Sequence, residues 1–452
     1  MAGLWFEAAL MPQGWASGVR LVLDEGAISH LQTGVDPDPA DERHAIGLPG
    51  LPNLHSHAFQ RAMAGRAERR GPEGEDFWSW RAQMYRLAAS LGPDELEAIA
   101  ALAFAEMLES GFTRVGEFHY LHHDLSGAPF ADPAEMAVRL AAAAEQAGIG
   151  LTLLPVFYAH SGFGGLAPSP AQRRFVHDLD GYAALLQASR RAVEPLGDAR
   201  VGVAPHSLRA VTPAELGALI VMAGEGPIHI HIAEQAREVE DCLAWSGRRP
   251  VEWLLANAEV GRRWCLVHAT HVTDTELDAI AVSGAVVGLC PITEANLGDG
   301  VFPAARFLER SGVIGIGSDS NVLIDAAEEL RWLDYGQRLA RLERTVLASR
   351  GAAVADELYR RARDGARQVL AMPAEELRVG APATMISLDA GHASLAAAPA
   401  AEILSRWIFA AGKAAVDCVW RRGRKVVAGG RHLNRDAILA RYQQAFSRIG
   451  GR

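Results

Sequence analysis

Closely spaced histidines are the residues of this sequence whose types and spacing most directly indicate chemistry. His55 and His57 stand two apart in NLHSH. Residues two apart in an extended segment project to the same side, so both can bind one metal ion. The segment HIHIAEQ repeats the spacing with His229 and His231; we expect His231, nearer the strand end, to reach the site and His229 to pack in the interior. The glycine-rich segment GIGSDSN leads to Asp319, whose alternative role is to cap a helix.

Three histidines and one aspartate form a nitrogen and oxygen ligand set. Such a set suits zinc best among the common metals, with iron and manganese as alternatives. Only Lys413 and Lys425 occur, so residues 1–412 offer no lysine for a Schiff base or for a metal-bridging carbamate. A disulfide framework or a cysteine zinc site is not expected, because the cysteines are far apart: Cys242, Cys265, Cys290 and Cys418.

Short apolar runs alternate with amphipathic stretches and would position these ligands. We expect strands at 46–53, 113–119, 151–158, 201–206, 227–233, 265–269, 285–291 and 313–319. Helical patterns lie between them, for example at 93–110 and 133–148. Repeated strand-then-helix order predicts an α/β fold with a parallel sheet, and eight strands indicate a (β/α)8 barrel similar to a TIM barrel. The pattern is also compatible with an open sheet.

The two ends of the chain have a different pattern, with β-like pieces such as VRLVLDEGAISHL and TMISLD. Neither end can bury a good core alone, so we expect residues 1–45 and 377–452 to form one small β-sandwich domain. A final helix at 434–449 should pack against the main body. Residues 46–376 then form the catalytic barrel. Active sites of such barrels lie at the carboxyl ends of the strands. Histidines recur at these ends: His55, His57, His119, His160, His206, His231 and His268.

The segments PGLPNLHSH, HIHIAEQ, LVHAT and GSDSN resemble the signatures of the amidohydrolase superfamily, in the expected order. The resemblance implies a metal-dependent barrel hydrolase with a composite β domain. Strand four ends in His206 instead of the lysine of the dinuclear branch, which implies the mononuclear deaminase branch and one metal ion. The loops HSHAFQRAMAG, FWSWRAQMY, GEFHYLHH, PHSLRAV and CPITEANLGDG resemble those of the deiminases that convert N-formimino-L-glutamate to N-formyl-L-glutamate and ammonia in histidine degradation.

This resemblance implies roles for individual residues. The metal ligands are His55, His57, His231 and Asp319. A bound zinc ion lowers the pKa of its water toward ~7. Asp319 would accept a proton from that water, His268 would orient it, and Glu234 would carry a proton to the departing nitrogen. The substrate has two carboxylates, which suit arginine. The residues carried over for substrate binding are Gln60, Arg81, Tyr120, His206 and Arg209.

Composition limits the other classes of function. The net charge of −10 argues against a nucleic-acid partner. We expect no signal peptide and no membrane span, hence a cytoplasmic protein; the resemblance further implies a small dicarboxylate substrate and a homodimer. Two alternatives remain open. One is a mononuclear zinc deaminase of a purine or pyrimidine ring, and the other is a non-catalytic binding protein on the same fold.

Overall fold

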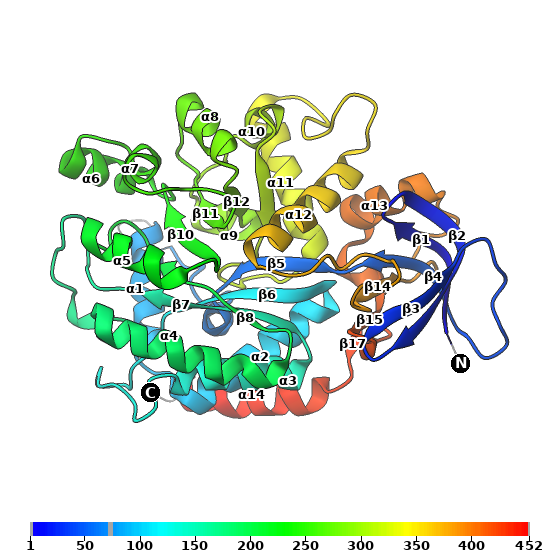
Figure 1. Cartoon of the computed structure of the whole chain (residues 1–452), viewed down its shortest axis with the longest axis horizontal. Helices are drawn as coiled ribbons and strands as arrows, with labels where there is room; N and C mark the ends of the chain where they lie inside the picture. The colour runs from blue at the N-terminus through cyan, green and yellow to red at the C-terminus, as the bar shows by residue number, and fades with distance from the viewer. Residues whose placement is uncertain (1–2, 71–75, 451–452) are drawn as a thin grey trace.

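The computed structural model of the protein describes residues 3–70 and 76–450. Parallel strands alternate with helices and surround a common axis (Figure 1). The barrel strands are β5 (Leu51–Ser56), β6 (Phe112–His119), β7 (Gly150–Phe157), β8 (Arg200–Val201) with β9 (Ala204–Pro205), β10 (Ile228–Ile232), β11 (Trp264–His268), β12 (Val286–Leu289) and β13 (Val313–Ile316).

Backbone bridges join the two halves of this sheet into a closed barrel. Val203 pairs with Ile228 beside β9 and β10, and Ser56 pairs with Asp319 between the first and last strands. At this second junction the Asp319 N–H donates to the carbonyl oxygen of His55 at 3.0 Å, and the His57 N–H donates to the carbonyl oxygen of Asp319 at 2.9 Å. The predicted α/β barrel is therefore confirmed, and its closing hydrogen bonds lie at the predicted metal ligands.

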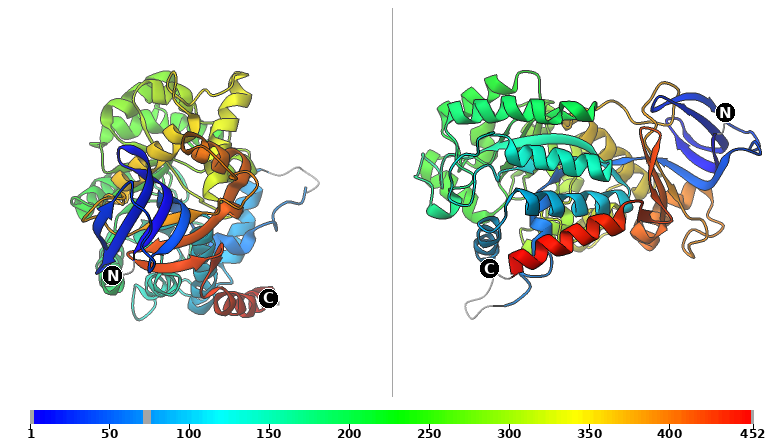
Figure 2. Two further views of the ribbon diagram at one scale, coloured as in Figure 1. Left: turned by 90° about the vertical axis from the view of Figure 1, so that its right-hand side faces the viewer. Right: turned by 90° about the horizontal axis from the view of Figure 1, so that it is seen from below.

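Most of the helices lie between consecutive strands and cover the outside of the barrel. The helices are α1 (Phe77–Ala88), α2 (Pro93–Glu109), α3 (Glu135–Ala147), α4 (Leu179–Val193), α5 (Pro213–Ala223), α6 (Ala236–Ser246), α7 (Pro250–Asn257), α8 (Asp274–Ser283), α9 (Pro291–Leu297), α10 (Ala304–Glu309), α11 (Ala326–Arg341), α12 (Val354–Val369), α13 (Ile403–Arg406) and α14 (Arg435–Gly450). Of these, α1 lies at the mouth of the barrel and α13 beside the small sheet. Short helical turns are η1 (Ala58–Met63), η2 (Pro170–Gln172), η3 (Glu194–Leu196), η4 (Ala400–Glu402), η5 (Trp407–Ala411) and η6 (Gly412–Ala415). The predicted final helix is α14, which packs along α2 (Figure 2).

The first predicted strand, at 46–53, is two strands in the structure. It divides at Gly50 between β4 (Glu42–Pro49) of the small sheet and β5 of the barrel. A Cβ atom at Gly50 would lie 2.3 Å from the Thr113 hydroxyl oxygen, so only glycine permits this approach. The sequence pattern did not reveal the division, because both strands are apolar and no polar turn separates them.

The strands outside the barrel come from both ends of the chain. They are β1 (Leu4–Met11), β2 (Gly14–Asp24), β3 (Ala27–Gln32), β4, β14 (Met385–Leu388), β15 (Val416–Arg421), β16 (Arg424–Ala428) and β17 (Arg431–His432). They form one mixed sheet in the order β17-β16-β15-β14-β4-β1-β2-β3. The sheet curls so strongly that Phe6 of β1 and Trp420 of β15, on strands separated by two others, lie with ring centroids 6.3 Å apart. The expected sandwich is thus built from a single continuous sheet.

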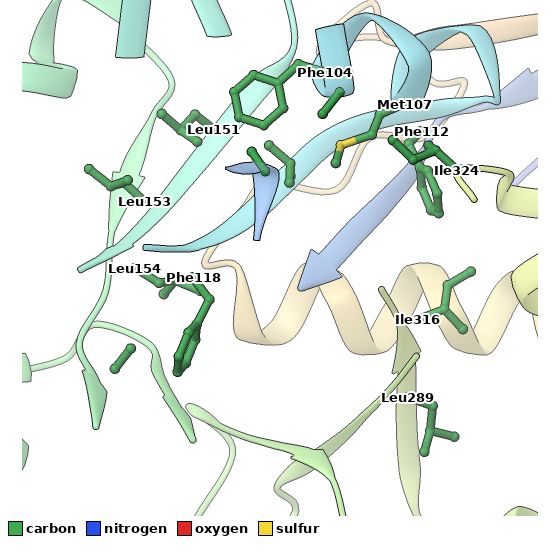
Figure 3. Close-up of a cluster of buried hydrophobic side chains, with 14 of the residues drawn as sticks. Phe104, Met107, Phe112, Phe118, Leu151, Leu153, Leu154, Leu289, Ile316 and Ile324 are labelled. Atoms are coloured by element: carbon green, nitrogen blue, oxygen red, sulfur yellow. The ribbon is translucent and has the colours of Figure 1, made fainter. Parts of the chain in front are cut away.

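Apolar side chains fill the space between strands and helices and continue to the functional end of the barrel. Figure 3 shows Phe104 and Met107 of α2 beside β6, with Phe118 at the far end of that strand. The Phe118 ring lies 5.0 Å from the His55 ring and 4.5 Å from the His231 ring, measured between centroids. Within the described ranges, no helix combines the length and apolar composition that crossing a membrane requires.

Asp41 anchors the outer edge of the small sheet. Its carboxylate accepts hydrogen bonds from Arg20 Nε at 2.7 Å and from the Gly3 N–H at 2.8 Å, and its side chain is fully buried. The hydrogen bond from Arg20 is the main cause that lowers the pKa of Asp41 to about 2. A carboxyl group with a depressed pKa stabilises the folded state above the unfolded pKa of about 4, and this contribution is lost as pH falls toward 2.

We therefore expect Asp41→Asn to lower the free energy of unfolding by about 1–3 kcal/mol at pH 7. The difference from the wild type should shrink between about pH 4 and pH 2, where Asp41 itself takes up a proton. Urea unfolding across this pH range measures both effects. The matched control is Asp38→Asn, which removes a 61% exposed partner of Arg20 and should change stability by less than about 1 kcal/mol. An equal loss of unfolding free energy in Asp41→Asn and Asp38→Asn would contradict the stabilising role assigned to Asp41.

Candidate metal centre and substrate cavity

Four buried side chains that can bind a metal ion meet at the carboxyl ends of β5, β10 and β13. His55 Nε2 lies 3.2 Å from His57 Nε2 and 3.1 Å from His231 Nε2. Asp319 Oδ1 lies 3.2 Å from His57 Nε2. The structure thus brings together the four ligands predicted from the sequence.

The protonation of these histidines tests whether the group fits a cation. The Nδ1 atom of His57 donates to the carbonyl oxygen of Phe118 at 2.8 Å, and that of His231 donates to the carbonyl oxygen of His206 at 3.0 Å. Burial lowers the pKa of His231 well below its ordinary value, so its ring is neutral and its Nε2 carries a lone pair. Nitrogen lone pairs and the Asp319 carboxylate therefore converge on one point. Such a donor set fits a divalent metal ion.

The backbone around Asp319 is unusual and orients its carboxylate. Asp319 has a φ of +43°, and the neighbouring Asn321 has a φ of +56°. Residues other than glycine rarely adopt this region, and its occurrence at functional sites stores strain. The adjacent Gly317 permits close contact, because a Cβ there would lie 2.7 Å from the carbonyl oxygen of His55. The following helix α11 is capped by Asp325, so the alternative capping role of Asp319 does not apply.

His268 lies beside the ligand group among three carboxylates. Its Nε2 is 3.8 Å from both Glu234 Oε1 and Asp319 Oδ2, and its Nδ1 is 3.2 Å from Glu294 Oε1. Burial disfavours the charged imidazolium, but the carboxylates, Glu234 foremost, outweigh burial and raise the pKa of His268 to about 10. Burial also raises the pKa of Glu234. The arrangement provides a hydrogen-bond donor and a carboxyl group able to hold a proton next to the ligands.

A cavity opens above these groups, and all five predicted substrate-binding residues line it. Its walls are formed by His57, Gln60, Phe77, Trp80, Arg81, Met84, Tyr85, Tyr120, Tyr158, Phe175, His206, Arg209, His231, Glu234, His268, Leu297 and Asp319. Gln60 Nε2 donates to the Tyr120 hydroxyl at 2.7 Å. Arg209 is buried, yet nearby carboxylates and tyrosines raise its pKa over the opposing effect of burial. The cavity therefore has a metal-binding floor and a cationic wall.

Other strand-end histidines lie outside this site. His160 pairs with Glu215 at 2.9 Å near the surface, and the His119 ring packs 5.0 Å from the His122 ring. His229 is buried and its Nε2 lies 2.8 Å from the carbonyl oxygen of Val369, consistent with the interior position expected for it.

The structure adds residues that the sequence did not single out. Glu294 contacts His268 and also accepts the backbone N–H of Cys290 at 2.9 Å. Its position in CPITEANLGDG, after a strand, was the available signal. Tyr158 lines the cavity, and Gln172 supports it by donating a hydrogen bond to its hydroxyl oxygen; both residues lie in the connection between β7 and α4. The sequence carried no periodic or motif signal for Gln172, because the contact is made by a long, irregular loop.

A second group of possible ligands lies on the small sheet and comprises Glu42, His44 and Cys418. Here Glu42 already forms an ion pair with Lys425. The two ring nitrogens of His44 lie 2.9 Å from Glu42 Oε1 and 3.4 Å from Asp417 Oδ2. The contacts of His44 with these two carboxylates, together with the Glu42–Lys425 ion pair, account for this group without a metal ion.

Comparisons with known proteins agree with this geometry. The Amidohydrolase family model matches residues 46–426, and the model described as "Formimidoylglutamate deiminase HutF, N-terminal domain" matches residues 1–45. A formimidoylglutamate deiminase from Pseudomonas aeruginosa is 48% identical, over 99% of this chain and all of its own length. A 5-methylthioadenosine/S-adenosylhomocysteine deaminase from Natronomonas pharaonis is 27% identical, over 82% of this chain and 78% of its own. The crystal structure of an amidohydrolase from Brucella melitensis superposes with a TM-score of 0.96 at 50% identity, covering 99% of this chain and 100% of that one.

A barrel with this ligand group at the carboxyl ends of its strands defines a metal-dependent hydrolase. The chain belongs to the amidohydrolase family, as its motifs predict. The more specific resemblance to deiminases of N-formimino-L-glutamate is likewise confirmed, by the N-terminal domain match and by the full-length relative.

The ligand group makes a prediction about metal content. After expression with added zinc, the wild-type protein should hold about one ion per chain. His231→Asn should weaken metal affinity by at least about 100-fold, because even residues that only support a ligand contribute about 10–100-fold. Elemental analysis and competition with a chelator measure both. The control is His160→Asn, which removes a histidine paired with Glu215 outside the site and should retain the metal. Full metal content in His231→Asn would contradict the assignment.

Proposed function

We propose that this protein is a formimidoylglutamate deiminase, which converts N-formimino-L-glutamate and water to N-formyl-L-glutamate and ammonia in histidine degradation. The observation that carries the proposal is one cavity that combines the buried ligand group with two arginines, Arg81 and Arg209. The full-length relative at 48% identity is named for this reaction. The reaction needs an activated water at the amidine carbon and groups that bind the two carboxylates of the substrate.

The reaction joins a water oxygen to the amidine carbon and breaks the bond from that carbon to the terminal nitrogen. Both water protons finish on the departing nitrogen, which leaves as ammonia. A bound divalent ion, which we propose to be a single zinc, supplies a Lewis acid that makes water a nucleophile near neutral pH. His55, His57, His231 and Asp319 would hold it. The side chains around the ion would then transfer two protons from the water to the departing nitrogen.

We assign this proton transfer to three side chains. Asp319, whose carboxylate also faces His268, would accept the first proton. His268 would donate a hydrogen bond that orients the attacking oxygen. Glu234 would deliver protons to the leaving nitrogen, because burial favours its protonated form. Such acid–base steps typically contribute ~10²–10⁴-fold to the rate.

The opposite wall would bind the two substrate carboxylates. Arg81 lies on α1 and Arg209 follows β9, so the wall is assembled from separate parts of the barrel. Arginine presents a planar fork of N–H groups that matches a carboxylate. We assign Gln60, Tyr120 and His206 to hydrogen bonds with the substrate carboxylates or imino group.

The same proposal covers the organisation of the protein. The sequence pattern divides the chain into a composite β domain, 1–45 with 377–452, and a catalytic barrel, 46–376; because β4 continues to Pro49 within the small sheet, we propose Gly50 as the first boundary. The continuous small sheet built from both ends supports this division. We further propose a cytoplasmic homodimer. The four cysteines are free and buried, as is usual in a reducing compartment.

The direct test is ammonia release from N-formimino-L-glutamate. The zinc-loaded protein should release ammonia and N-formyl-L-glutamate in equal amounts, and a chelator should abolish the activity until zinc is restored. Glu234→Gln should lower kcat by about 10²–10⁴-fold with metal retained. Absence of release from a metal-loaded wild-type protein would refute the proposed substrate.

A second candidate is deamination of a purine or pyrimidine ring. It is favoured by the 27% identical relative, named a 5-methylthioadenosine/S-adenosylhomocysteine deaminase, and by the aromatic side chains that line the cavity. A ring substrate would use stacking groups and would not need paired arginines.

Arginine variants distinguish the two candidates. Arg81→Met or Arg209→Met should lower kcat/KM for N-formimino-L-glutamate by about 10–100-fold, because each removes hydrogen bonds to a charged group. Metal content should stay unchanged. Arg344→Met, at an exposed position, is the matched control and should retain full activity. Undiminished activity in both cavity variants would exclude a dicarboxylate-binding role for this wall.

A further inference from the structure

We propose that Gln172 is a positioning residue for substrate specificity: it fixes the hydroxyl groups of Tyr158 and Tyr85 so that, with Arg81 and Arg209, they bind the side-chain carboxylate of N-formimino-L-glutamate. The inference rests on the proposed function and adds residues to the site. It starts from a buried amide whose hydrogen bonds can be assigned one by one.

The orientation of the Gln172 amide is set by the backbone. Gln172 ends η2 and is 1% exposed. Its Oε1 accepts the N–H of Ser169 at 2.7 Å. A backbone N–H can only donate, so Oε1 and Nε2 cannot exchange places. The Nε2 atom, a donor of two hydrogens, therefore faces the tyrosines.

The two hydrogens on Gln172 Nε2 determine which hydrogen bonds the hydroxyl groups of Tyr158 and Tyr85 can still form. Gln172 Nε2 donates to the Tyr158 oxygen at 2.6 Å and to the Tyr85 oxygen at 3.4 Å. The Tyr85 oxygen also accepts Arg81 Nε at 2.6 Å. Both lone pairs of Tyr85 are thus occupied, and its own hydrogen must be donated, either to Tyr158 or to a ligand. In either case the Tyr158 hydrogen points away from Gln172 and serves an acceptor in the cavity. An acceptor-only group such as a carboxylate completes the network.

Three guanidinium groups lie around the Trp78 ring beside this network. The guanidinium carbons of Arg81 and Arg209 lie 5.2 and 5.9 Å from the centre of the Trp78 ring, and that of Arg237 lies 4.9 Å from it. Because Arg81 Nε bonds to Tyr85, the Nη atoms of Arg81 remain the groups that can form a fork around a carboxylate. Burial raises the pKa of Tyr158, so this hydroxyl stays protonated and remains a donor.

Distance from the metal ligands indicates which carboxylate is bound. The rings of Tyr120 and His206 pack directly on ligand rings, 5.1 Å from His57 and 5.0 Å from His231 respectively. Tyr158 packs in turn on His206, at 4.7 Å. Tyr158 therefore belongs to a layer one ring farther from the ligands. The reacting carbon lies close to the α-carboxylate in the substrate and farther from the side-chain carboxylate, which the outer layer would bind.

The test compares N-formimino-L-glutamate with its neutral isostere, N-formimino-L-glutamine. Gln172→Glu keeps the shape of the side chain but replaces the donor amide with an acceptor, which attracts the tyrosine hydrogens and repels a carboxylate. We expect KM for the glutamate substrate to rise about 10–100-fold, with kcat within about threefold. KM for the glutamine substrate should change by less than about threefold. The preference of the enzyme for the glutamate substrate over the glutamine substrate should therefore become smaller.

Tyr158→Phe removes only the donated hydroxyl and should raise KM for the glutamate substrate by about 10-fold. KM of the double variant, Gln172→Glu with Tyr158→Phe, should not exceed KM of Gln172→Glu alone, because both changes remove the same interaction with the substrate. Gln187→Glu, the same substitution at an exposed position on α4, is the control and should behave as the wild type. The replacement Gln172→His can still donate a hydrogen bond, so it should retain more of the preference for the glutamate substrate than Gln172→Glu does.

A binding measurement separates this inference from the proposed reaction. Calorimetry with N-formyl-L-glutamate and N-formyl-L-glutamine should show a preference for the dicarboxylate that Gln172→Glu reduces by about 10-fold or more. If the wild type releases no ammonia but shows this preference, the proposed reaction fails and the carboxylate site stands. Equal effects of Gln172→Glu on both substrates, or no effect on either, would overturn the inference.

Discussion

The closure of the barrel and the construction of the metal centre depend on the same backbone hydrogen bonds. The strand pair that joins the first and last strands runs through His55, His57 and Asp319. Three of the four candidate ligands, His55, His57 and Asp319, therefore cannot separate without opening the barrel. Carbonyl oxygens of Phe118 and His206 fix the tautomers of His57 and His231, which aims their lone pairs at one point. The free energy of folding offsets the repulsion between these lone pairs and the carboxylate, so the group is assembled before any metal ion binds.

The cavity above this centre brings together groups of both charges. Carboxylates gather around His268 on the floor, whereas Arg81 and Arg209 lie beside Trp78. Arg209 is close enough to Glu238 and Glu234 for these carboxylates to raise its pKa over the opposing effect of burial. A substrate that carries an electrophilic amidine together with two carboxylates matches these groups better than a neutral ring does.

Much of the fold could be predicted because each strand is a short apolar run followed by a helical pattern. The expectation of strands near β6, β7 and β10 to β13 was accurate within a few residues. The division at Gly50 could not be predicted, since it depends on the approach of Thr113 from another strand. That His55 and His57 face the same side could be predicted because they are two apart in an extended segment, and local spacing fixes which side they face.

The sequence by itself determined the residue types of the metal centre and the strands that carry them, because period-two spacing at a strand end is a local property. Only the tertiary structure decided that Glu294 supports His268 and that Gln172 faces Tyr158 and Tyr85. Each of these depends on loops brought together by barrel closure. Hydrogen bonds across long sequence separations follow from the packing of whole elements, and no local pattern in the chain encodes them.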